Sequence, residues 1–414
     1  MKTEVIREDM DRAASLVRAG ALVAVPTETV YGLAGNGLDE KAVERIYEVK
    51  GRPEVKPLSL MVPGPEAFEK CCLDVPDPAR VLASRFWPGP LTIILRARPE
   101  IPRIVLAGGD TVGLRCPDHP LTLELLRKCG LPLAAPSANP SGRPSPKTAK
   151  QVLDYFEGNI EAVIDGGECG IGLESTIIDL TRAPYRILRR GALPERDIAA
   201  ALAENMRIIG ITGGTGTGKT TALDVLRRMG ALCLDCDEIY HELTNTSDAL
   251  REAIERRFGE MYTAEGRLDR KKLGNIVFND PRALAELNLI THGFVDDEIK
   301  KRLRDHAMRG GKLAAIDAIA LIESGASRFC TDTFGITAPS ELREQRIMAR
   351  EGISREYARL RIDAQQPDEY YKRHCTSIIE NRGTKAEFAV RCTTAFTEVI
   401  KNGRKAGLPQ GTLL

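Results

Sequence analysis

Residues 213–220 read GGTGTGKT, which fits the spacing Gly-x4-Gly-Lys-Thr. This loop follows an apolar run and precedes a helical pattern, the context in which such loops bind phosphate. Glycines allow backbone angles that point successive N–H groups at phosphate oxygens, and the following helix adds its positive end. We expect Lys219 to neutralise the β- and γ-phosphates and Thr220 to hold Mg²⁺. The predicted nucleotide-binding residues here are Gly213, Gly214, Thr215, Gly216, Thr217, Gly218, Lys219, Thr220 and Thr221.

Two aspartates follow the next predicted strand, in CLDCDEIYHEL. Asp235 and Asp237 would lie at the carboxyl edge of the sheet, where ligands bind in open α/β folds. We predict that they are catalytic, since a carboxylate there could accept a hydroxyl proton or anchor Mg²⁺. For Asp237 the alternative is a helix N-cap. An Asn-Lys-x-Asp guanine reader, which a GTPase would usually carry, does not occur after residue 206.

A row of arginines in SELREQRIMAREGISREYARLRI is the third element of this predicted site. Arg343, Arg346 and Arg350 have helical spacing, which a solvated face with glutamate partners would also show. Because a phosphate loop lies upstream, we favour a mobile lid that closes over the transferring phosphoryl group and stabilises its charge.

The position of the phosphate loop, halfway along 414 residues, predicts two domains. The pattern restarts at Met206 with a strand, the loop and a helix, so we expect domains at 1–205 and 206–414. The first alternates strand-like runs (21–26, 58–62, 91–97, 111–116, 131–136 and 175–180) with helical patterns such as 39–50. We predict an α/β protein: a twisted mixed sheet with helices, then a parallel sheet with a helical lid.

The composition excludes several classes of protein. Hydrophobic content is 43%, charged content 28% and formal net charge +1, so no bulk attraction to nucleic acid or membrane is expected. The N-terminus MKTEVIREDM lacks the apolar core of a signal peptide, which favours a cytoplasmic protein. Cys233 and Cys236 have redox spacing but fall on a predicted strand, and we expect them to be buried.

The first half carries weaker polar motifs. PTETVYGLAGN follows a predicted strand, Lys50 and Arg52 stand at a helix end with Lys56 nearby, and Ser137 and Asn139 follow another strand. They could form a phosphate or carboxylate site. Alternatively, Lys50 is a helix-end cation and Ser-Ala-Asn-Pro is a turn.

In the second half, MRIIGITGGTGTGKTT, LDCDEI, LDRKKLGNIVF, LNLITHGFV, DAIALIESG and RIMAREGISREYARLRIDAQ together resemble the dephospho-CoA kinases. The resemblance implies transfer of the ATP γ-phosphoryl group to the ribose 3′-hydroxyl of dephospho-CoA. It puts Asp235 and Asp237 on the acceptor side and implies that Arg346 and Arg350 are lid arginines. Gly293 and Ile319 stand where this family usually has proline, in segments expected to line the acceptor pocket. The acceptor specificity is therefore open.

Over residues 5–195, VPTETVYGL, KGRP, KPLSL, WPGPLTIIL, TVGLRCPDHP, APSANPSG, ESTIIDL and ILRRGAL resemble the YrdC-like threonylcarbamoyl-AMP synthases. The resemblance implies synthesis of threonylcarbamoyl-adenylate and pyrophosphate from L-threonine, bicarbonate and ATP, for N6-threonylcarbamoyladenosine in tRNA. The implied nucleotide site comprises Lys50, Arg52, Lys56, Thr111, Ser137, Asn139, Ser145 and Arg189, with Arg52 and Lys56 catalytic. The implied L-threonine site comprises Thr29, Arg115 and Ser175. We expect positioning and electrostatics to supply most of the catalysis, since no residue is an evident general base.

We therefore expect a bifunctional enzyme that uses ATP and Mg²⁺ and acts on small molecules. A transient contact with the tRNA threonylcarbamoyl transferase is also expected, without required nucleic-acid or membrane binding. One alternative is an RNA-binding module with a regulatory ATPase, which an aromatic content of 5% disfavours. Another is that one half is catalytically inactive.

Overall fold

The computed structural model describes residues 2–53 and 56–401. Contacts divide the chain into two compact units, of which the first extends to Leu202 and also includes Met308–Gly310. The second begins at Ala203. The domain boundary between residues 205 and 206 remains a prediction. Among the described residues no helix is long and apolar enough to cross a membrane.

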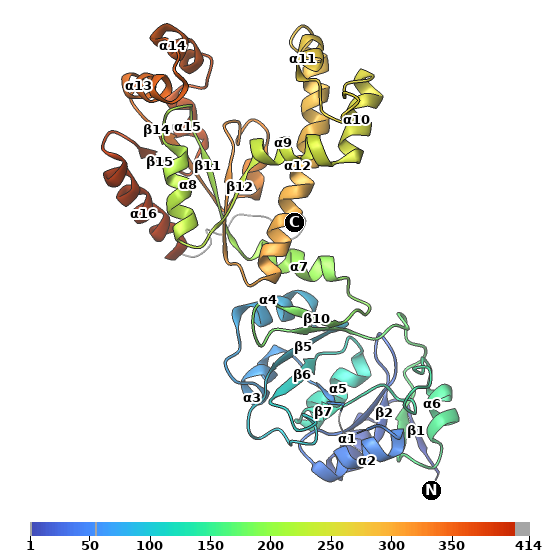
Figure 1. Cartoon of the computed structure of the whole chain (residues 1–414). Coiled ribbons are helices and arrows are strands. Elements are labelled where there is room, and N and C mark those ends of the chain that lie inside the picture. Colours follow the sequence, from blue (N-terminus) through green and yellow to red (C-terminus); the bar gives the residue numbers. More distant parts are fainter. Residues whose placement is uncertain (1, 54–55, 402–414) are drawn as a thin grey trace. The chain divides into compact units, whose positions relative to one another are not determined.

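The first unit is built on a ten-stranded mixed sheet (Figure 1). Some neighbouring strands run parallel and others antiparallel, as in the β4–β6 and β5–β6 pairs. The predicted mixed sheet is thus confirmed. Its order is β1 (Glu4–Ile6), β8 (Ala162–Ile164), β2 (Val23–Val25), β3 (Gly32–Asn36), β7 (Leu133–Ala134), β4 (Ser59–Met61), β6 (Thr111–Arg115), β5 (Leu91–Arg96), β9 (Thr176–Asp179) and β10 (Arg186–Arg189).

Helices cover this sheet, and α2 (Glu40–Lys50) shows why the sequence folds as it does. The Asp39 side chain caps its first turn by accepting from the Lys41 N–H, and Gly51 ends it in a left-handed conformation. The C-terminal end of α2 positions Lys50 and Arg52. The other helices are α1 (Met10–Arg18), α3 (Phe68–Cys71), α4 (Asp77–Phe86), α5 (Pro120–Cys129), α6 (Ala149–Phe156) and α7 (Glu195–Glu204), with a short 3₁₀ turn at Pro65–Ala67.

The second unit contains a five-stranded sheet in which every neighbouring pair is parallel. Its order is β12 (Leu232–Asp235), β13 (Leu313–Asp317), β11 (Arg207–Thr212), β14 (Asp332–Thr337) and β15 (Ser377–Glu380). Helices α8 (Lys219–Arg228) and α16 (Lys385–Lys401) pack side by side on one face (Figure 1). The central strands β13, β11 and β14 are almost entirely buried, as expected for a covered parallel sheet. The predicted parallel sheet is also confirmed.

Two helical groups extend beyond this sheet (Figure 1). We call α10 (Asp248–Phe258), α11 (Arg270–Val277) and the first half of α12 (Pro281–Met308) the arm, and α13 (Ser340–Glu351) with α14 (Arg355–Asp363) the lid. The arm has its own core, in which Leu250, Leu273 and Leu287 are buried. The remaining elements are α9 (Cys236–Thr246), α15 (Asp368–His374) and a 3₁₀ turn at Ala326–Phe329.

One expectation about the cysteines is wrong. Cys233 lies on β12, but Cys236 is the first residue of α9, and both are half-buried rather than fully buried. The strand ends at Asp235 because the side chain of this residue caps the helix.

Candidate active sites

The phosphate loop connects β11 to α8 in a conformation that requires glycine. Gly213 has φ 136°, and a Cβ there would lie 2.2 Å from the Ile336 carbonyl oxygen. Gly218 has φ 109° and is the N-cap residue directly before α8. The Lys219 ammonium donates to the Gly213 carbonyl at 2.9 Å and so lies across the loop. Burial lowers the pKa of Lys219, while Asp317 and Asp237 favour its charged form.

The lid holds the tip of this loop through Thr215. Arg343 is buried, and its Nε donates to the Thr215 carbonyl at 2.9 Å. Gln365, which the sequence reasoning missed, accepts from the Thr215 N–H at 2.8 Å and donates to its hydroxyl at 2.7 Å. Arg343 Nη2 also donates to the Gln365 oxygen at 2.9 Å. The loop and the lid are therefore directly linked.

The two predicted lid arginines have different surroundings. Arg346 donates to the Gly216 carbonyl and to the Asn381 side chain, each at 3.2 Å. Asn381 in turn donates to the Thr217 carbonyl at 2.8 Å. Arg350 pairs instead with Glu351 at 2.5 Å, on the exposed side of α13. Of the three arginines in this row, Arg343 and Arg346 contact the loop.

The contact between lid and loop yields a prediction for Gly214. A Cβ there would lie 2.2 Å from Arg343 Nη2, so Gly214→Ala should displace the loop and lower the kcat/KM for ADP formation about 100-fold, since displacements near 1 Å can have such effects. Gly214→Ala combined with Arg343→Ala removes the clash with the guanidinium, although a Cβ at residue 214 would still lie 2.8 Å from Gln365 Oε1. The double variant should therefore recover part of this loss in steady-state assays. A double variant no more active than Gly214→Ala alone would contradict the link.

The two predicted aspartates differ in role. The Asp235 carboxylate accepts from the N–H groups of Asp237 and Glu238 at 2.9 and 3.1 Å, so it is the N-cap of α9. The capping function considered for Asp237 therefore belongs to Asp235. Asp237 is exposed and faces a cavity next to the loop.

A third carboxylate, which the sequence reasoning missed, ends β13. Asp317 is directly paired with Asp235 across the β12–β13 ladder, and β13 neighbours β11. It is 9% exposed, and its Oδ1 is buried without a hydrogen-bond partner. Burial raises the pKa of Asp317 to about 6, against the attraction of Lys219. The signal for it was an apolar run, LAAI, that ends in an acid.

Asp317 predicts a pH-dependent stability of the second unit without nucleotide and metal. Because its pKa rises from 3.8 to about 6 on folding, its contribution is present below about pH 4 and is lost as the pH rises through 6. A shift of about two pKa units is worth about 3 kcal/mol. Asp317→Asn should therefore stabilise this unit at pH 7.5 but hardly at pH 4. Urea unfolding followed by circular dichroism tests this, with Trp87 fluorescence reporting the first unit, and an unchanged pH dependence would contradict it.

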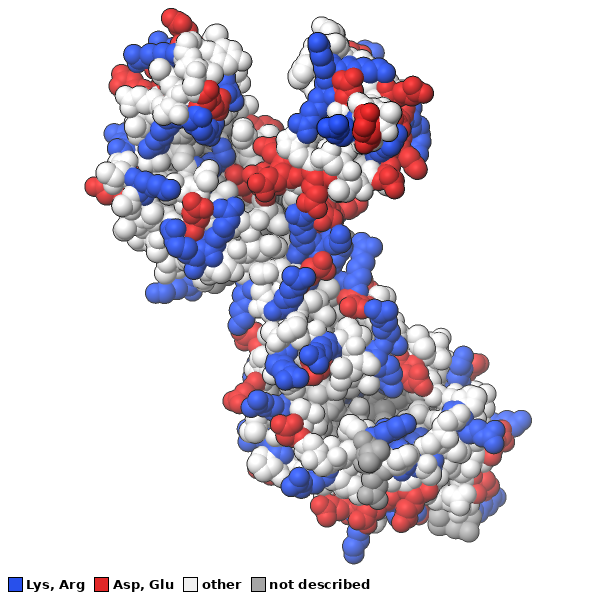
Figure 2. All heavy atoms as spheres, viewed as in Figure 1, with Lys and Arg blue, Asp and Glu red and all other residues white. Residues whose placement is uncertain are grey.

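A cavity of about 350 Å³ lies between α9, α12 and residues 318–326. Asp237, Tyr240, Asn288, His292, Asp296 and Ile319 are among its lining residues. Ile319 thus lines a cavity, and its place in the acceptor pocket stays a prediction. Gly293 is not among the lining residues, although His292 beside it is. Figure 2 shows acidic side chains gathered near α9, between the arm and the lid.

The first unit has a smaller cavity, of about 140 Å³. Of the predicted residues, Arg52, Arg115, Ser137, Ser175 and Arg189 line it, together with Thr92 and Glu174, which were not predicted. The other predicted residues (Thr29, Lys50, Lys56, Thr111, Asn139 and Ser145) are not among its lining residues. Thr29, Lys50 and Ser145 nevertheless form hydrogen bonds with residues that line the cavity.

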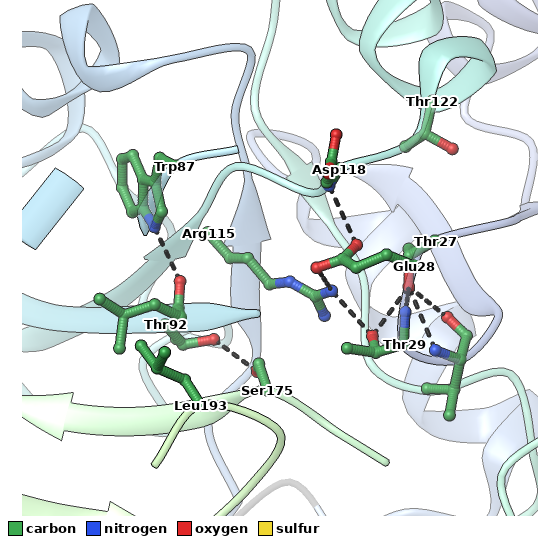
Figure 3. A network of polar contacts seen from close by, with 12 residues as sticks. Thr27, Glu28, Thr29, Trp87, Thr92, Arg115, Asp118, Thr122, Ser175 and Leu193 are labelled. Carbon is green, nitrogen blue, oxygen red and sulfur yellow. Dashed lines mark hydrogen bonds and ion pairs between the residues drawn. The ribbon is translucent and has the colours of Figure 1, made fainter. Parts of the chain in front are cut away.

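Arg115 is the centre of a buried network (Figure 3). Its Nη2 donates to Glu28 at 2.8 Å and to the Thr29 hydroxyl at 2.7 Å. The other Glu28 oxygen accepts from the Asp118 N–H at 3.0 Å. Arg115 Nε is buried and has no partner. The guanidinium is thus fixed from one side and retains a free donor, which suits a carboxylate ligand.

Arg189 and Thr92 hold Ser175. The Ser175 hydroxyl lies 2.8 Å from that of Thr92, and Arg189 donates to its carbonyl and its hydroxyl at 2.9 and 3.0 Å. Burial lowers the pKa of Arg189. Glu174 opposes this shift, and Arg115 and Arg52 add to it. The three arginines and Glu174 therefore share one electrostatic environment.

Lys50 connects the two motifs of the predicted nucleotide site. It is 3% exposed, and its ammonium donates to the carbonyls of Ser137 and, at 2.5 Å, of Asn139. Burial lowers the pKa of Lys50 to about 7, and Arg52 contributes to this shift. Lys50 thus anchors the Ser-x-Asn loop to the end of α2. Asn139 Oδ1 remains buried and without a partner.

Family comparisons identify both halves. The Sua5/YciO/YrdC family model, described as telomere recombination, matches residues 15–191. The CoaE family model, described as dephospho-CoA kinase, matches residues 207–387.

Individual relatives agree with this division. The threonylcarbamoyl-AMP synthase of Pyrococcus abyssi is 50% identical over 192 residues, which are 46% of this chain and 56% of the relative, so the chain spans about half of that protein. A putative threonylcarbamoyl-AMP synthase of Mycobacterium tuberculosis is 37% identical, covering 46% of this chain and 87% of the relative. The dephospho-CoA kinase of Dehalococcoides mccartyi is 37% identical, and the match covers 42% of this chain and 89% of the relative.

Among solved structures, the crystal structure of Pyrococcus abyssi Sua5 complexed with L-threonine is 29% identical, covers 81% of this chain and 100% of that chain, and has a TM-score of 0.47. The sequence relatives confirm the resemblance of each half. The chain therefore belongs to the Sua5/YciO/YrdC family in its first half and to the dephospho-CoA kinase family in its second half.

Proposed function

We propose that the chain is a bifunctional enzyme, in which the first unit makes threonylcarbamoyl-adenylate and pyrophosphate from L-threonine, bicarbonate and ATP. The observation that carries this proposal is the buried Arg115 with a free Nε, in a cavity shared with Arg52 and Arg189. The reaction joins a carbamate anion to a triphosphate, so neutralisation of charge is the main requirement. Arg52 and Arg189 would hold the phosphates, and Arg115 with Ser175 the amino acid.

The second unit would phosphorylate the ribose 3′-hydroxyl of dephospho-CoA with ATP. The observation that carries this proposal is the phosphate loop beside a cavity that Asp237 lines. Lys219 and Arg346 would stabilise the charge of the transferring phosphoryl group, and the lid would exclude water. Asp237 would accept the hydroxyl proton, since it is exposed to the cavity while Asp235 is engaged as a cap.

Mg²⁺ fits the second site. The described residues contain no cluster of three or more His, Cys, Asp or Glu side chains that could hold a metal by themselves. The unpartnered Oδ1 of Asp317, with the Thr220 hydroxyl, could complete a site whose other ligands are phosphate oxygens and water. Bound Mg²⁺ would neutralise the phosphates next to the acidic side chains around α9.

The two activities can be tested in one preparation, because their by-products differ. Purified protein should release pyrophosphate when L-threonine and bicarbonate are present, and ADP when dephospho-CoA is present. Each by-product should depend on its own co-substrates. Absence of one by-product would show that the corresponding half is inactive.

The alternative of an RNA-binding module with a regulatory ATPase has no observation in its favour, whereas the relatives of both halves are named as enzymes. Salt-dependent RNA binding without turnover of either substrate set would support it. A cytoplasmic location and a transient contact with the tRNA threonylcarbamoyl transferase belong to the proposal as well.

A further inference from the structure

The cavity of the first unit contains a carboxylate that its proposed chemistry does not explain. Among the described residues that line it, Glu174 is the one acid, beside Arg52, Arg115 and Arg189. Glu174 opposes the burial-induced shift in the pKa of Arg189, so it lies within electrostatic reach of that guanidinium. A fixed negative charge repels the triphosphate of ATP. A cationic group on a bound ligand next to this carboxylate would offset that repulsion.

The backbone holds Glu174 rigidly. Its carbonyl accepts from the Ala192 N–H at 2.9 Å, and a Cβ on Gly191 would lie 2.3 Å from the same oxygen, so the two segments are in close contact. The Ser145 hydroxyl donates to one carboxylate oxygen at 2.8 Å. Glu174 directly precedes Ser175, which Thr92 and Arg189 fix. The carboxylate is therefore preorganised two residues before β9.

Arg115 lines the same cavity from the end of β6 and offers its buried Nε (Figure 3). A cationic donor and a carboxylate that line one small cavity match the two charges of an α-amino acid. Arg115 suits the carboxylate of such a ligand, and Glu174 suits its ammonium. A ligand with a carboxylate alone would satisfy Arg115 but would bring no cationic group to Glu174.

We infer that Glu174 binds the α-ammonium group of the amino-acid substrate and so selects for α-amino acids. This inference rests on the function proposed for the first unit and adds a contact to its amino-acid site. The nitrogen of this ammonium becomes the carbamate nitrogen after it has released one proton to solvent and condensed with bicarbonate, with loss of water. Glu174 would therefore also orient the reacting nitrogen relative to the ATP held by Arg52 and Arg189. The other cation that a carboxylate here could bind is Mg²⁺.

Calorimetric titration separates these contacts without requiring turnover. The ligands are L-threonine and 3-hydroxybutanoate, which keeps the carboxylate and hydroxyl groups but lacks the amine. Glu174→Gln should weaken L-threonine binding about 10- to 100-fold, as expected for loss of a charged hydrogen bond, and leave 3-hydroxybutanoate binding unchanged. Arg115→Lys should weaken both ligands. Glu168→Gln, an exposed glutamate of the same connection that does not line the cavity, is the matched control.

Different failures would have different meanings. If the wild-type protein does not bind L-threonine, the function proposed for the first unit is wrong. If it does and Glu174→Gln binds equally well, the inference is overturned. It is also overturned if Glu174→Gln changes the Mg²⁺ dependence of pyrophosphate release but not L-threonine binding. Glu174→Asp, which keeps the charge, should bind L-threonine with an affinity between those of the wild type and Glu174→Gln. It replaces Glu174→Gln in this test if the glutamine variant does not fold.

Discussion

Replacing Lys219 by alanine is expected to slow dephospho-CoA-dependent ADP release by about 10³-fold, the size of effect seen when one preorganised charged donor to a transition state is removed. Lys219 lies across the phosphate loop with its ammonium 2.9 Å from the Gly213 carbonyl, in a position to move onto incoming phosphates. Alanine offers no charge to replace it. A coupled ADP assay measures the loss.

The same variant should release pyrophosphate at the wild-type rate, because the first unit has its own cavity and its own cationic residues. Lys271→Ala, an exposed lysine of α11, is the control for loss of a lysine from the second unit and should leave both activities intact. Loss of both by-products in Lys219→Ala would refute independent sites.

Arg115→Ala is expected to have the largest effect on the first unit, since it removes the predicted carboxylate-binding group. Pyrophosphate release should fall by about 10³-fold, because a charged contact and the orientation of the substrate are both lost. The variant should also be about 3–5 kcal/mol less stable, since Glu28 would remain largely buried without its partner. Urea unfolding followed by Trp87 fluorescence measures the stability.

A second substitution separates these two effects. Glu28→Gln in the Arg115→Ala background removes the stranded charge, so it should restore most of the stability and none of the activity. If the double variant were as unstable as Arg115→Ala, the loss would come from packing rather than from an unpaired carboxylate.

The parts of the sites that the sequence predicts are those made within one short segment. The phosphate loop needs a strand, glycines at fixed positions and a helix, all within about twenty residues, so its pattern is readable. The end of α2 is equally local, since Asp39 and Gly51 fix where the helix starts and stops. Both folds followed from such segments together with the restart of the pattern at Met206.

The residues that were missed depend on contacts between distant segments. Glu28, which was missed, is 87 positions from the predicted Arg115. Gln365, which was also missed, contacts the predicted Thr215 across 150 positions. Asp317 opens the motif DAIALIESG, yet its importance follows from its pairing with Asp235 on a neighbouring strand. Glu174 stands in ESTIIDL next to the predicted Ser175, but only the lining of the cavity shows that its own side chain belongs to the site. No local pattern encodes these relations.

The arginine row illustrates the same limit within one helix. Spacing predicts that Arg343, Arg346 and Arg350 share a face, but it does not distinguish the buried Arg343 from Arg350, which pairs with a neighbouring glutamate. The orientation of α13 relative to the phosphate loop decides which arginines contact the loop, and this orientation depends on tertiary packing.

The anchoring of Ser137 and Asn139 by Lys50 has a thermodynamic consequence for nucleotide binding. Chain segments that are almost ninety residues apart are already joined in the free protein, so their conformational entropy is lost when the chain folds rather than when ATP arrives. Association at that loop is then close to rigid docking, and its rate is set mainly by diffusion and orientation.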